Sequence, residues 1–385
     1  MAPVGVWSPP MKKEWILQHA DPEAVARLQA ALQCSPVTAA VLVNREIVSA
    51  AQASDFLNAT LKDFRPPFDI RDMAAAVRRI GRAILAGEKI LIFGDYDVDG
   101  VTSVTLLQEF LQYAGADVTY YIPHRTREGY DLQVNHILGV ALPAEADLII
   151  TVDCGSSRHD SVQAARDSGI DVVITDHHTI DAPPPAAAVV NPKRRDCAAG
   201  FEHLAGVGVV FTLLIHLRKY LRDIDFWQNR PEPNLKNFCD LVALGTAADM
   251  VPMVGENRIL SRTGLDIINR GHRPGLRALV RMSGIKDRPV MMDDIAFRLG
   301  PRINAAGRMG HASLAVDLLT AADDSGAEAA AMALNRMNKK RQDTEKEILA
   351  QVMAHEISHA LANHTAEKMS MAMATQMGMM GVAVA

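Results

Sequence analysis

The stretch ILIFGDYDVDGVTSV, residues 90–104, decides what kind of fold this chain can form. Its first four residues are apolar and suit a buried strand, and its last residues open a helix-like segment. Between them lie three alternate carboxylates, Asp95, Asp97 and Asp99. In a parallel sheet, such residues lie in the crevice at the carboxyl end of the strand, where ligands bind. The stretch therefore predicts a strand, an acidic ligand-binding loop and a helix in succession.

The alternation of strand and helix continues around this stretch. Short apolar runs suit buried strands at 89–93, 118–122, 147–152, 171–175 and 188–190. Helix-like segments lie at 72–86, 102–113 and 161–168. Strands that alternate with helices predict an α/β fold, with a parallel sheet and helices on both faces. Apolar strands without polar alternation agree, because such a sheet buries both sides of each strand.

The remainder of the chain is expected to be helical. A helical preface is predicted at 1–70, and a domain at 71–324 combines an α/β part (71–192) with a helical part (193–324). A stretch rich in Ala, Glu and Lys then predicts a long connecting helix at 325–363, which would join two bodies.

Acidic and histidine side chains also follow two other predicted strands. Asp153 ends the run DLIITV, and Asp176, His177 and His178 end the run DVVIT. Because parallel strands present their carboxyl ends at one edge of the sheet, we expect these side chains beside the first acidic loop. Asp249, in LGTAADMVP of the helical part, is a further candidate ligand.

The types of side chain in this set indicate the metal and the chemistry. Aspartate and histidine without thiolates suit Mn²⁺ or Mg²⁺ better than a structural zinc. Six such ligands can hold two ions that share one carboxylate. Two ions about 3.5–4 Å apart activate a water and stabilise both oxygens of an in-line phosphoryl displacement. The residues alone therefore predict hydrolysis of a phosphoester.

The bulk composition sets broader limits. The chain has 385 residues, a net charge of −5 and a pI near 6.2, which neither favours nor excludes a nucleic-acid binder. Four cysteines lie far apart, which disfavours a zinc site or disulfide scaffold and suits a reducing cytoplasm. The first fifteen residues have no apolar core of signal-peptide length.

The last residues, 364–385, form a methionine-rich, atypical tail. The tail is too short and too mixed to span a membrane, which takes roughly 20 apolar residues. We expect no membrane insertion and interpret the tail as a truncated or altered terminus.

A metalloprotease-like motif precedes the tail. The residues from His355 to His359 read H-E-x-x-H, which on a helix places two imidazoles on one face. Ala362 and Thr365 stand where the extended motif needs Gly and His. We therefore interpret the pair as histidines on a surface helix.

Four motifs, in order, resemble those of the DHH phosphoesterases: GDYDVDG, VDCG, DHH and GTAAD. The linking text AVVNPKRRDC, LAGVGVVF, ALGTAADMVPMVGENR and LGPRINAAGRMG is similar to the bacterial single-strand-specific exonucleases of that family, over roughly residues 13–350. The resemblance implies removal of 5′-mononucleotides from the 5′ end of single-stranded DNA, in repair and recombination, with two Mn²⁺ or Mg²⁺ ions. It implies no particular protein partner.

The resemblance also implies how the two ions would be held. Asp97 and Asp153 would bind one ion, with Asp95 beside them. Asp153 would bridge to the other ion, whose further ligands would be Asp99, His177 and Asp249.

Other residues would act on the substrate. His178 would face the scissile phosphate and stabilise its developing charge, while Asp176 would orient a histidine. The resemblance and the suitability of arginine for phosphate indicate contacts to the DNA backbone in LGPRINAAGRMG, through Arg302, Asn304 and Arg308.

The chain departs from the family in two respects. It has Gly129-Tyr130-Asp131-Leu132 where relatives carry Gly-Tyr-Gly-Leu, which affects local substrate contacts. The second catalytic domain (DHHA1) and the OB-fold domain of the family are not found in this sequence. Two alternatives therefore stay open: a phosphodiesterase for short oligonucleotides or cyclic dinucleotides, and a catalytically weak form that only binds single strands or a partner.

Overall fold

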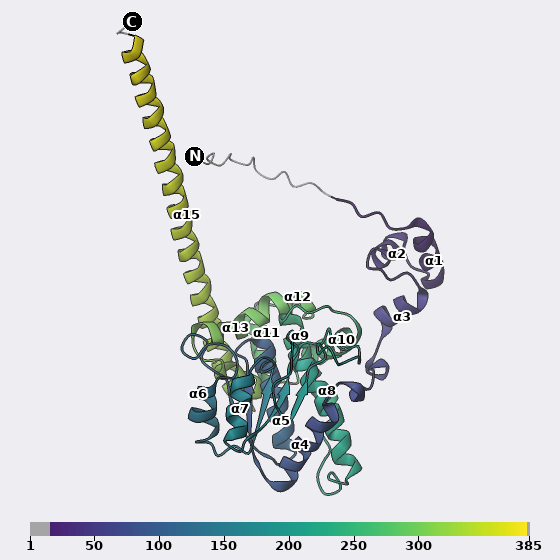
Figure 1. Cartoon of the computed structure of the whole chain (residues 1–385). Coiled ribbons are helices and arrows are strands. Elements are labelled where there is room, and N and C mark those ends of the chain that lie inside the picture. Colours follow the sequence, from purple (N-terminus) through teal and green to yellow (C-terminus); the bar gives the residue numbers. More distant parts are fainter. Residues whose placement is uncertain (1–15, 383–385) are drawn as a thin grey trace. The chain divides into compact units, whose positions relative to one another are not determined.

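Figure 1 shows the computed structural model, which describes the backbone of residues 16–382 and the side chains of residues 16–359. The chain divides into two compact units, Met1–Phe64 and Arg65–Ala385. Residues 1–15, where we expected no signal peptide, lie outside the described part, as do residues 383–385.

The first unit is a small helical body. It contains α1 (Pro22–Leu32), α2 (Pro36–Val43), α3 (Ala50–Asn58) and the 3₁₀ turn η1 (Leu61–Asp63). The three α-helices start at residues whose side chains accept hydrogen bonds from the first turn, namely Asp21, Ser35 and Ser49. Its buried core is formed by Leu28, Ala39, Leu42 and Ala53.

The second unit is built on a five-stranded sheet in which every pairing is parallel. The strand order is β2-β1-β3-β4-β5. The strands are β1 (Lys89–Gly94), β2 (Asp117–Tyr121), β3 (Leu148–Val152), β4 (Asp171–Thr175) and β5 (Ala188–Val190). The register pairs Gly94 with Val152, and Val152 with Thr175, so β1, β3 and β4 end side by side.

Helices cover both faces of the sheet. One face packs on α6 (Val134–His136), the π turn η3 (Ile137–Ala141) and α7 (His159–Asp167), in a core that includes Phe93 and Ile149. The strands also contact another set of helices, α4 (Met73–Ala86), α5 (Val98–Tyr113) and α8 (Gly206–Asp223), which covers the opposite face. This arrangement confirms the predicted α/β fold class.

The chain continues as packed helices, as predicted. After the short turn η2 (Pro67–Asp69) near the start of the unit, the later elements are η4 (Leu235–Phe238), α9 (Cys239–Ala248), α10 (Gly255–Arg270), α11 (Pro274–Met282), α12 (Met292–Asp294), η5 (Ile295–Leu299), α13 (Gly300–Met309) and α14 (Ser313–Thr320). Helix α9 contacts α5, α8 and α10, which fixes its end near the sheet edge. Gly264 permits the α9–α10 contact, because a Cβ there would collide with the carbonyl of Cys239.

The last helix, α15, spans Asp324–Val382. Its start packs against α11, α13 and α14. We expected a connecting helix at 325–363 and a separate tail after it, whereas the helical backbone continues through most of the tail. Alanine and methionine favour helix and no proline follows Asp324, so nothing local ends it. Within the described part, no helix combines the length and the apolar character needed to cross a membrane.

Candidate metal centre

The predicted ligands meet at the carboxyl edge of the sheet. Asp95 follows β1, Asp153 follows β3, and Asp176 and the two histidines follow β4. Asp97 caps α5, since its Oδ1 accepts a hydrogen bond from the Gly100 backbone at 3.0 Å. The ends of β1, β3 and β4 and the start of α5 therefore gather these polar side chains just beyond the last residues of the strands.

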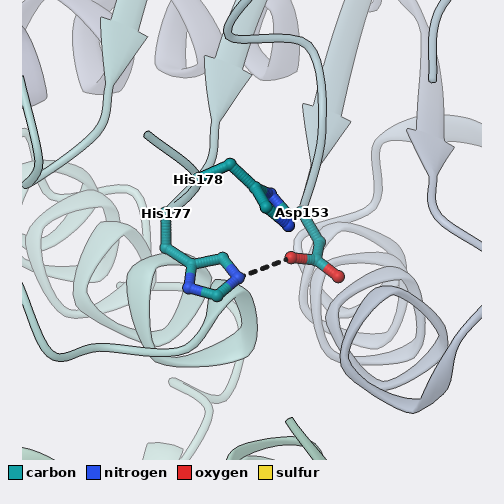
Figure 2. A group of neighbouring side chains, drawn as sticks. All are labelled: Asp153, His177 and His178. Carbon is teal, nitrogen blue, oxygen red and sulfur yellow. Dashed lines mark ion pairs between the residues drawn. The ribbon is translucent and has the colours of Figure 1, made fainter. Parts of the chain in front are cut away.

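His177 lies at the centre of the cluster. Its Nε2 is 3.1 Å from Asp153 Oδ1, 3.7 Å from Asp99 Oδ2 and 3.6 Å from Asp249 Oδ2. Figure 2 shows the contact with Asp153, and the neighbouring His178 on the same loop. Asp249, at the end of α9, therefore lies beside residues that precede it by more than seventy positions in the sequence.

The side chains form three overlapping groups in which the ligand atoms lie within 4.8 Å of one another. They are Asp95, Asp97 and Asp153; Asp99, His177 and Asp249; and Asp153, His177 and His178. Asp153 belongs to the first and third groups, and His177 belongs to the second and third, so these two residues link all three groups. The arrangement has the two sets of donors and the shared carboxylate that a two-ion centre requires.

Asp153 is held in an unusual backbone conformation. Its φ of +61° lies in the left-handed region, which non-glycine residues rarely adopt. Its side chain is 2% exposed and faces Gly206, where a Cβ would lie 2.6 Å from Asp153 Oδ1. Such strain persists only where the surrounding structure enforces it, and it is often found at functional sites.

Burial raises the pKa of the carboxyl groups in this cluster. The pKa of Asp95 rises to about 8 through burial and the neighbouring charge of Asp97. Burial and nearby carboxylates also hold the pKa values of Asp99 and Asp153 well above the usual range. The pKa of Asp249 rises to about 6 for the same reasons. A cation among these side chains would remove this penalty, because it favours their charged forms.

Several buried polar atoms at the centre have no hydrogen-bond partner among the residues that the structure describes. They include Asp95 Oδ1, Asp153 Oδ1 and both ring nitrogens of His177. Burial, followed by the charge of His178, lowers the pKa of His177 to about 4, so the ring is neutral and can donate a lone pair. Since buried polar groups are normally satisfied, the carboxylate oxygens and the one ring nitrogen of neutral His177 that carries a lone pair fit a metal centre.

His178 has the opposite character. Its Nδ1 lies 2.8 Å from Asp176 Oδ1, and this hydrogen bond raises the pKa of His178 to about 9. Asp176 is buried and also accepts hydrogen bonds from the backbone N–H groups of His177, His178 and Ser156. Burial alone would raise the pKa of Asp176, but the hydrogen bonds from His178 and Ser156 outweigh it and lower this pKa. His178 is therefore a half-exposed imidazolium at neutral pH.

The three predicted phosphate ligands lie on α13 in different surroundings. Asn304 Oδ1 accepts a hydrogen bond from the Val98 backbone at 3.1 Å, which joins α13 to the acidic loop. Arg302 instead donates to Asn335 Oδ1 on α15 and to the Arg298 carbonyl. Arg308 is exposed. The structure thus brings Asn304 to the acidic loop, while two of the donor groups of Arg302 already bond to other residues of the chain.

Sequence analysis did not identify the start of α8 as part of the site. The backbone N–H groups of Gly206 and Val207 donate to the two oxygens of Asp99, at 2.6 and 2.9 Å. The positive end of the α8 dipole therefore faces this buried carboxylate. The only signal was the glycine pair in LAGVGVVF, a stretch that resembles the family but suggests no role by itself.

The run Gly129–Leu132, which the sequence connected with substrate contacts but not with the metal ligands, places Tyr130 beside the site. Its ring lies edge-on to His178 and to Tyr96, with centroids 6.2 Å apart in both pairs. The next residue, Asp131, has a φ of +73°, and its carboxylate accepts a hydrogen bond from Arg158 at 2.7 Å. This φ explains why relatives can place glycine at that position.

Comparison with known proteins agrees with this geometry. Residues 89–246 match the family model described as DHH family, N-terminal domain, so the fold and the site define a protein of the DHH class. Single-stranded-DNA-specific exonucleases RecJ are 38% identical over 332 residues in Bacillus subtilis (strain 168) and 36% over 341 residues in Escherichia coli (strain K12). The chain belongs to the RecJ family within that class.

Solved structures of RecJ proteins also match this chain over only part of their own length. A crystal structure of exonuclease RecJ bound to manganese has a TM-score of 0.65 and 36% identity, and the match covers 73% of this chain and 69% of that one. RecJ from Thermus thermophilus in complex with Mn²⁺ has a TM-score of 0.73 and 32% identity, over 87% of this chain and 46% of that one. The matches span 40% and 58% of the Bacillus subtilis and Escherichia coli proteins, and 86% and 87% of this chain.

A second family model, described as Peptidase family M48, matches residues 277–385. That range includes the H-E-x-x-H motif on α15. His355 and His359 are both exposed, and their Nε2 atoms lie 3.0 Å apart. Among the side chains that the structure describes, no third metal-ligating group lies beside this pair.

Proposed function

We propose that this chain is the catalytic part of a metal-dependent exonuclease that hydrolyses single-stranded DNA from the 5′ end, in DNA repair and recombination. The observation that carries the proposal is the set of three overlapping ligand groups at the sheet edge, which Asp153 and His177 link. The proposal rests further on the RecJ relatives, which are named for activity on single-stranded DNA. Four free cysteines suit a cytoplasmic enzyme.

Two Mn²⁺ or Mg²⁺ ions would be held by the carboxylates and His177. Asp95, Asp97 and Asp153 would hold one ion, and Asp153 would be shared with a second set of Asp99, His177 and Asp249. Such ions supply a water of lowered pKa and stabilise charge on the phosphate oxygens. In this chain His177 is neutral and Asp153 is buried, and a neutral imidazole is the form that binds a metal ion.

His178 would act on the substrate itself. Asp176 keeps it protonated and fixes its ring through the bond to Nδ1. A half-exposed imidazolium beside the ligands can stabilise the negative charge that grows on the scissile phosphate. Asp176 is then a positioning residue, because it acts through His178.

Helix α13 would guide the DNA backbone. Arg308 is exposed and free to form a bidentate contact with a phosphate. Arg302 keeps donors beyond its bonds to Asn335 and Arg298, and Asn304 keeps its Nδ2 group. These three residues would position the strand without reading its sequence.

The proposal is tested by digestion of a 5′-labelled single-stranded oligonucleotide with Mn²⁺. The wild-type chain should release labelled mononucleotide, and Asp153→Ala should reduce the rate by at least about 100-fold, since it removes the shared ligand. Asp160→Ala, an exposed aspartate on α7, is the matched control and should retain the rate. No release by the wild-type chain, with intact metal binding, would favour the alternative that the chain only binds single strands.

A further inference from the structure

Helix α15 carries a long stretch that nothing in the described part of its unit covers. Every residue from 342 to 359 is exposed. Figure 1 shows this yellow-green part of the helix projecting beyond the other helices of the second unit. In proteins, most of the stability of a helix comes from packing an apolar face. This stretch has no such packing within its own chain, among the residues described.

One side of the stretch has the pattern of a helix that packs on another helix. Ile348, Val352, His355 and His359 follow one another at spacings of four, three and four residues. Residues so spaced lie on one side of a helix, in the alternation found at the contact line of coiled coils. Ile348 and Val352 are 55% and 52% exposed. We call these four residues the α15 seam.

The two histidines of the α15 seam are placed to chelate a metal. Their Nε2 atoms lie 3.0 Å apart, and their ring planes are nearly perpendicular, at 88°. A tetrahedral zinc with Zn–N bonds of about 2.0–2.1 Å places two ligand nitrogens roughly 3.3 Å apart. The separation of the two nitrogens is therefore close to that of two ligands of one ion.

A single chain cannot complete this site with the side chains that the structure describes. Tetrahedral zinc takes four protein ligands in structural sites, and α15 offers two imidazoles. All described groups of three or more metal-ligating side chains lie at the sheet edge, and none includes His355 or His359. A second copy would supply two more imidazoles and cover Ile348 and Val352 in the same contact, because a two-fold interface is self-complementary.

We propose that two copies of the chain pack through the α15 seam and bind one transition-metal ion, such as Zn²⁺, with His355 and His359 of each copy. Four imidazoles suit Zn²⁺, whereas the carboxylates at the sheet edge suit Mn²⁺ or Mg²⁺. The two sites therefore differ in ligand type and in preferred metal. This inference does not depend on the nuclease activity.

The test is the molar mass of the full chain in solution, measured by light scattering with and without Zn²⁺. We expect the mass to double from 41.8 kDa when Zn²⁺ is added and to return when a chelator removes it. A double variant, His355→Ala with His359→Ala, should stay at the single-chain mass. His19→Ala is the matched control, because it removes an exposed histidine elsewhere, and it should dimerise like the wild type.

Two further measurements separate the parts of the inference. Ile348→Lys with Val352→Lys keeps both histidines and should prevent the doubling, because charges replace the apolar contact. Co²⁺ in place of Zn²⁺ should give the intense visible absorption of a tetrahedral site in the wild type and lose it in the double histidine variant. A mass that Zn²⁺ leaves unchanged, or a double histidine variant that dimerises as well as the wild type, would overturn the proposal.

Discussion

At the scale of single residues, the site depends on close contacts with backbone and glycine. Asp99 is buried, yet its two oxygens accept hydrogen bonds from the first N–H groups of α8. Asp153 has a left-handed backbone and lies directly against Gly206. The geometry of both carboxylates therefore depends on position 206 as well as on the elements that carry them, α5 for Asp99 and the end of β3 for Asp153.

We expect Gly206→Ala to disrupt the metal centre. The added Cβ would lie 2.6 Å from Asp153 Oδ1, closer than two such atoms can approach, so the carboxylate must move. The affinity for Mn²⁺, measured by calorimetric titration, should fall by at least about tenfold, as for loss of a group that orients a ligand. Gly139→Ala is the control, because nothing lies within 4 Å of a Cβ there. Equal affinities for the two variants would contradict this account of Asp153.

We also expect the pair of Asp131 and Arg158 to hold Tyr130 against His178. Asp131→Gly removes the carboxylate and leaves a residue that suits the φ of +73°, so the fold should persist. Asp131→Gly and Arg158→Ala should each reduce kcat/KM, and the double variant should be no slower than either. Their coupling in unfolding experiments should be about 1 kcal/mol. Independent, additive effects on kcat/KM would show that the pair does not act as a unit.

At the scale of elements, parallel strands explain how much of the site could be predicted. Asp95, Asp153 and Asp176 follow apolar runs, and strands that run in parallel bring their ends together. The start of α8 could not be predicted as part of the site, because it lies more than a hundred residues after Asp99 and bonds through backbone N–H groups. The full length of α15 was also missed, because a methionine-rich composition was interpreted as a tail.

Asp294, the last residue of α12, gives a pH-dependent prediction. Hydrogen bonds from Arg288 lower the pKa of Asp294 to about 2, against a usual value of 3.8. A lowered folded-state pKa stabilises the protein above the usual pKa, and the stabilisation disappears as the pH falls through the folded value. Asp294→Asn should lower the free energy of unfolding at pH 7 by about 1 kcal/mol, after allowing for the partial exposure of Arg288.

That difference between Asp294→Asn and the wild type should shrink between pH 4 and pH 2, which thermal unfolding across this range would measure. Asp293→Asn, on the neighbouring position of α12, is a control that should leave the pH dependence unchanged. If the difference stays constant down to pH 2, the effect of the substitution comes from the shape of the side chain at position 294 and not from its charge.

At the scale of the whole molecule, the question is how much DNA this chain can hold. The chain spans 40% of the length of the Bacillus subtilis relative and 58% of the Escherichia coli relative. We expect kcat/KM to rise with substrate length, because Arg308 and its neighbours on α13 would, as proposed, contact phosphates away from the cleaved bond. Arg308→Ala should make DNA binding less dependent on salt, by the amount expected for the loss of ~1 phosphate contact. A series from dinucleotide to longer strands with constant kcat/KM would favour the short-substrate alternative.

The central claim is that Asp153 is shared by two metal ions at the carboxyl edge of the sheet. Crystals of the chain grown with Mn²⁺ would test it directly through the anomalous scattering of manganese. We expect two peaks about 3.5–4 Å apart on either side of the Asp153 carboxylate. One set should lie against Asp95 and Asp97, and the other against Asp99, His177 and Asp249. A single peak, or peaks that do not contact Asp153, would contradict the account.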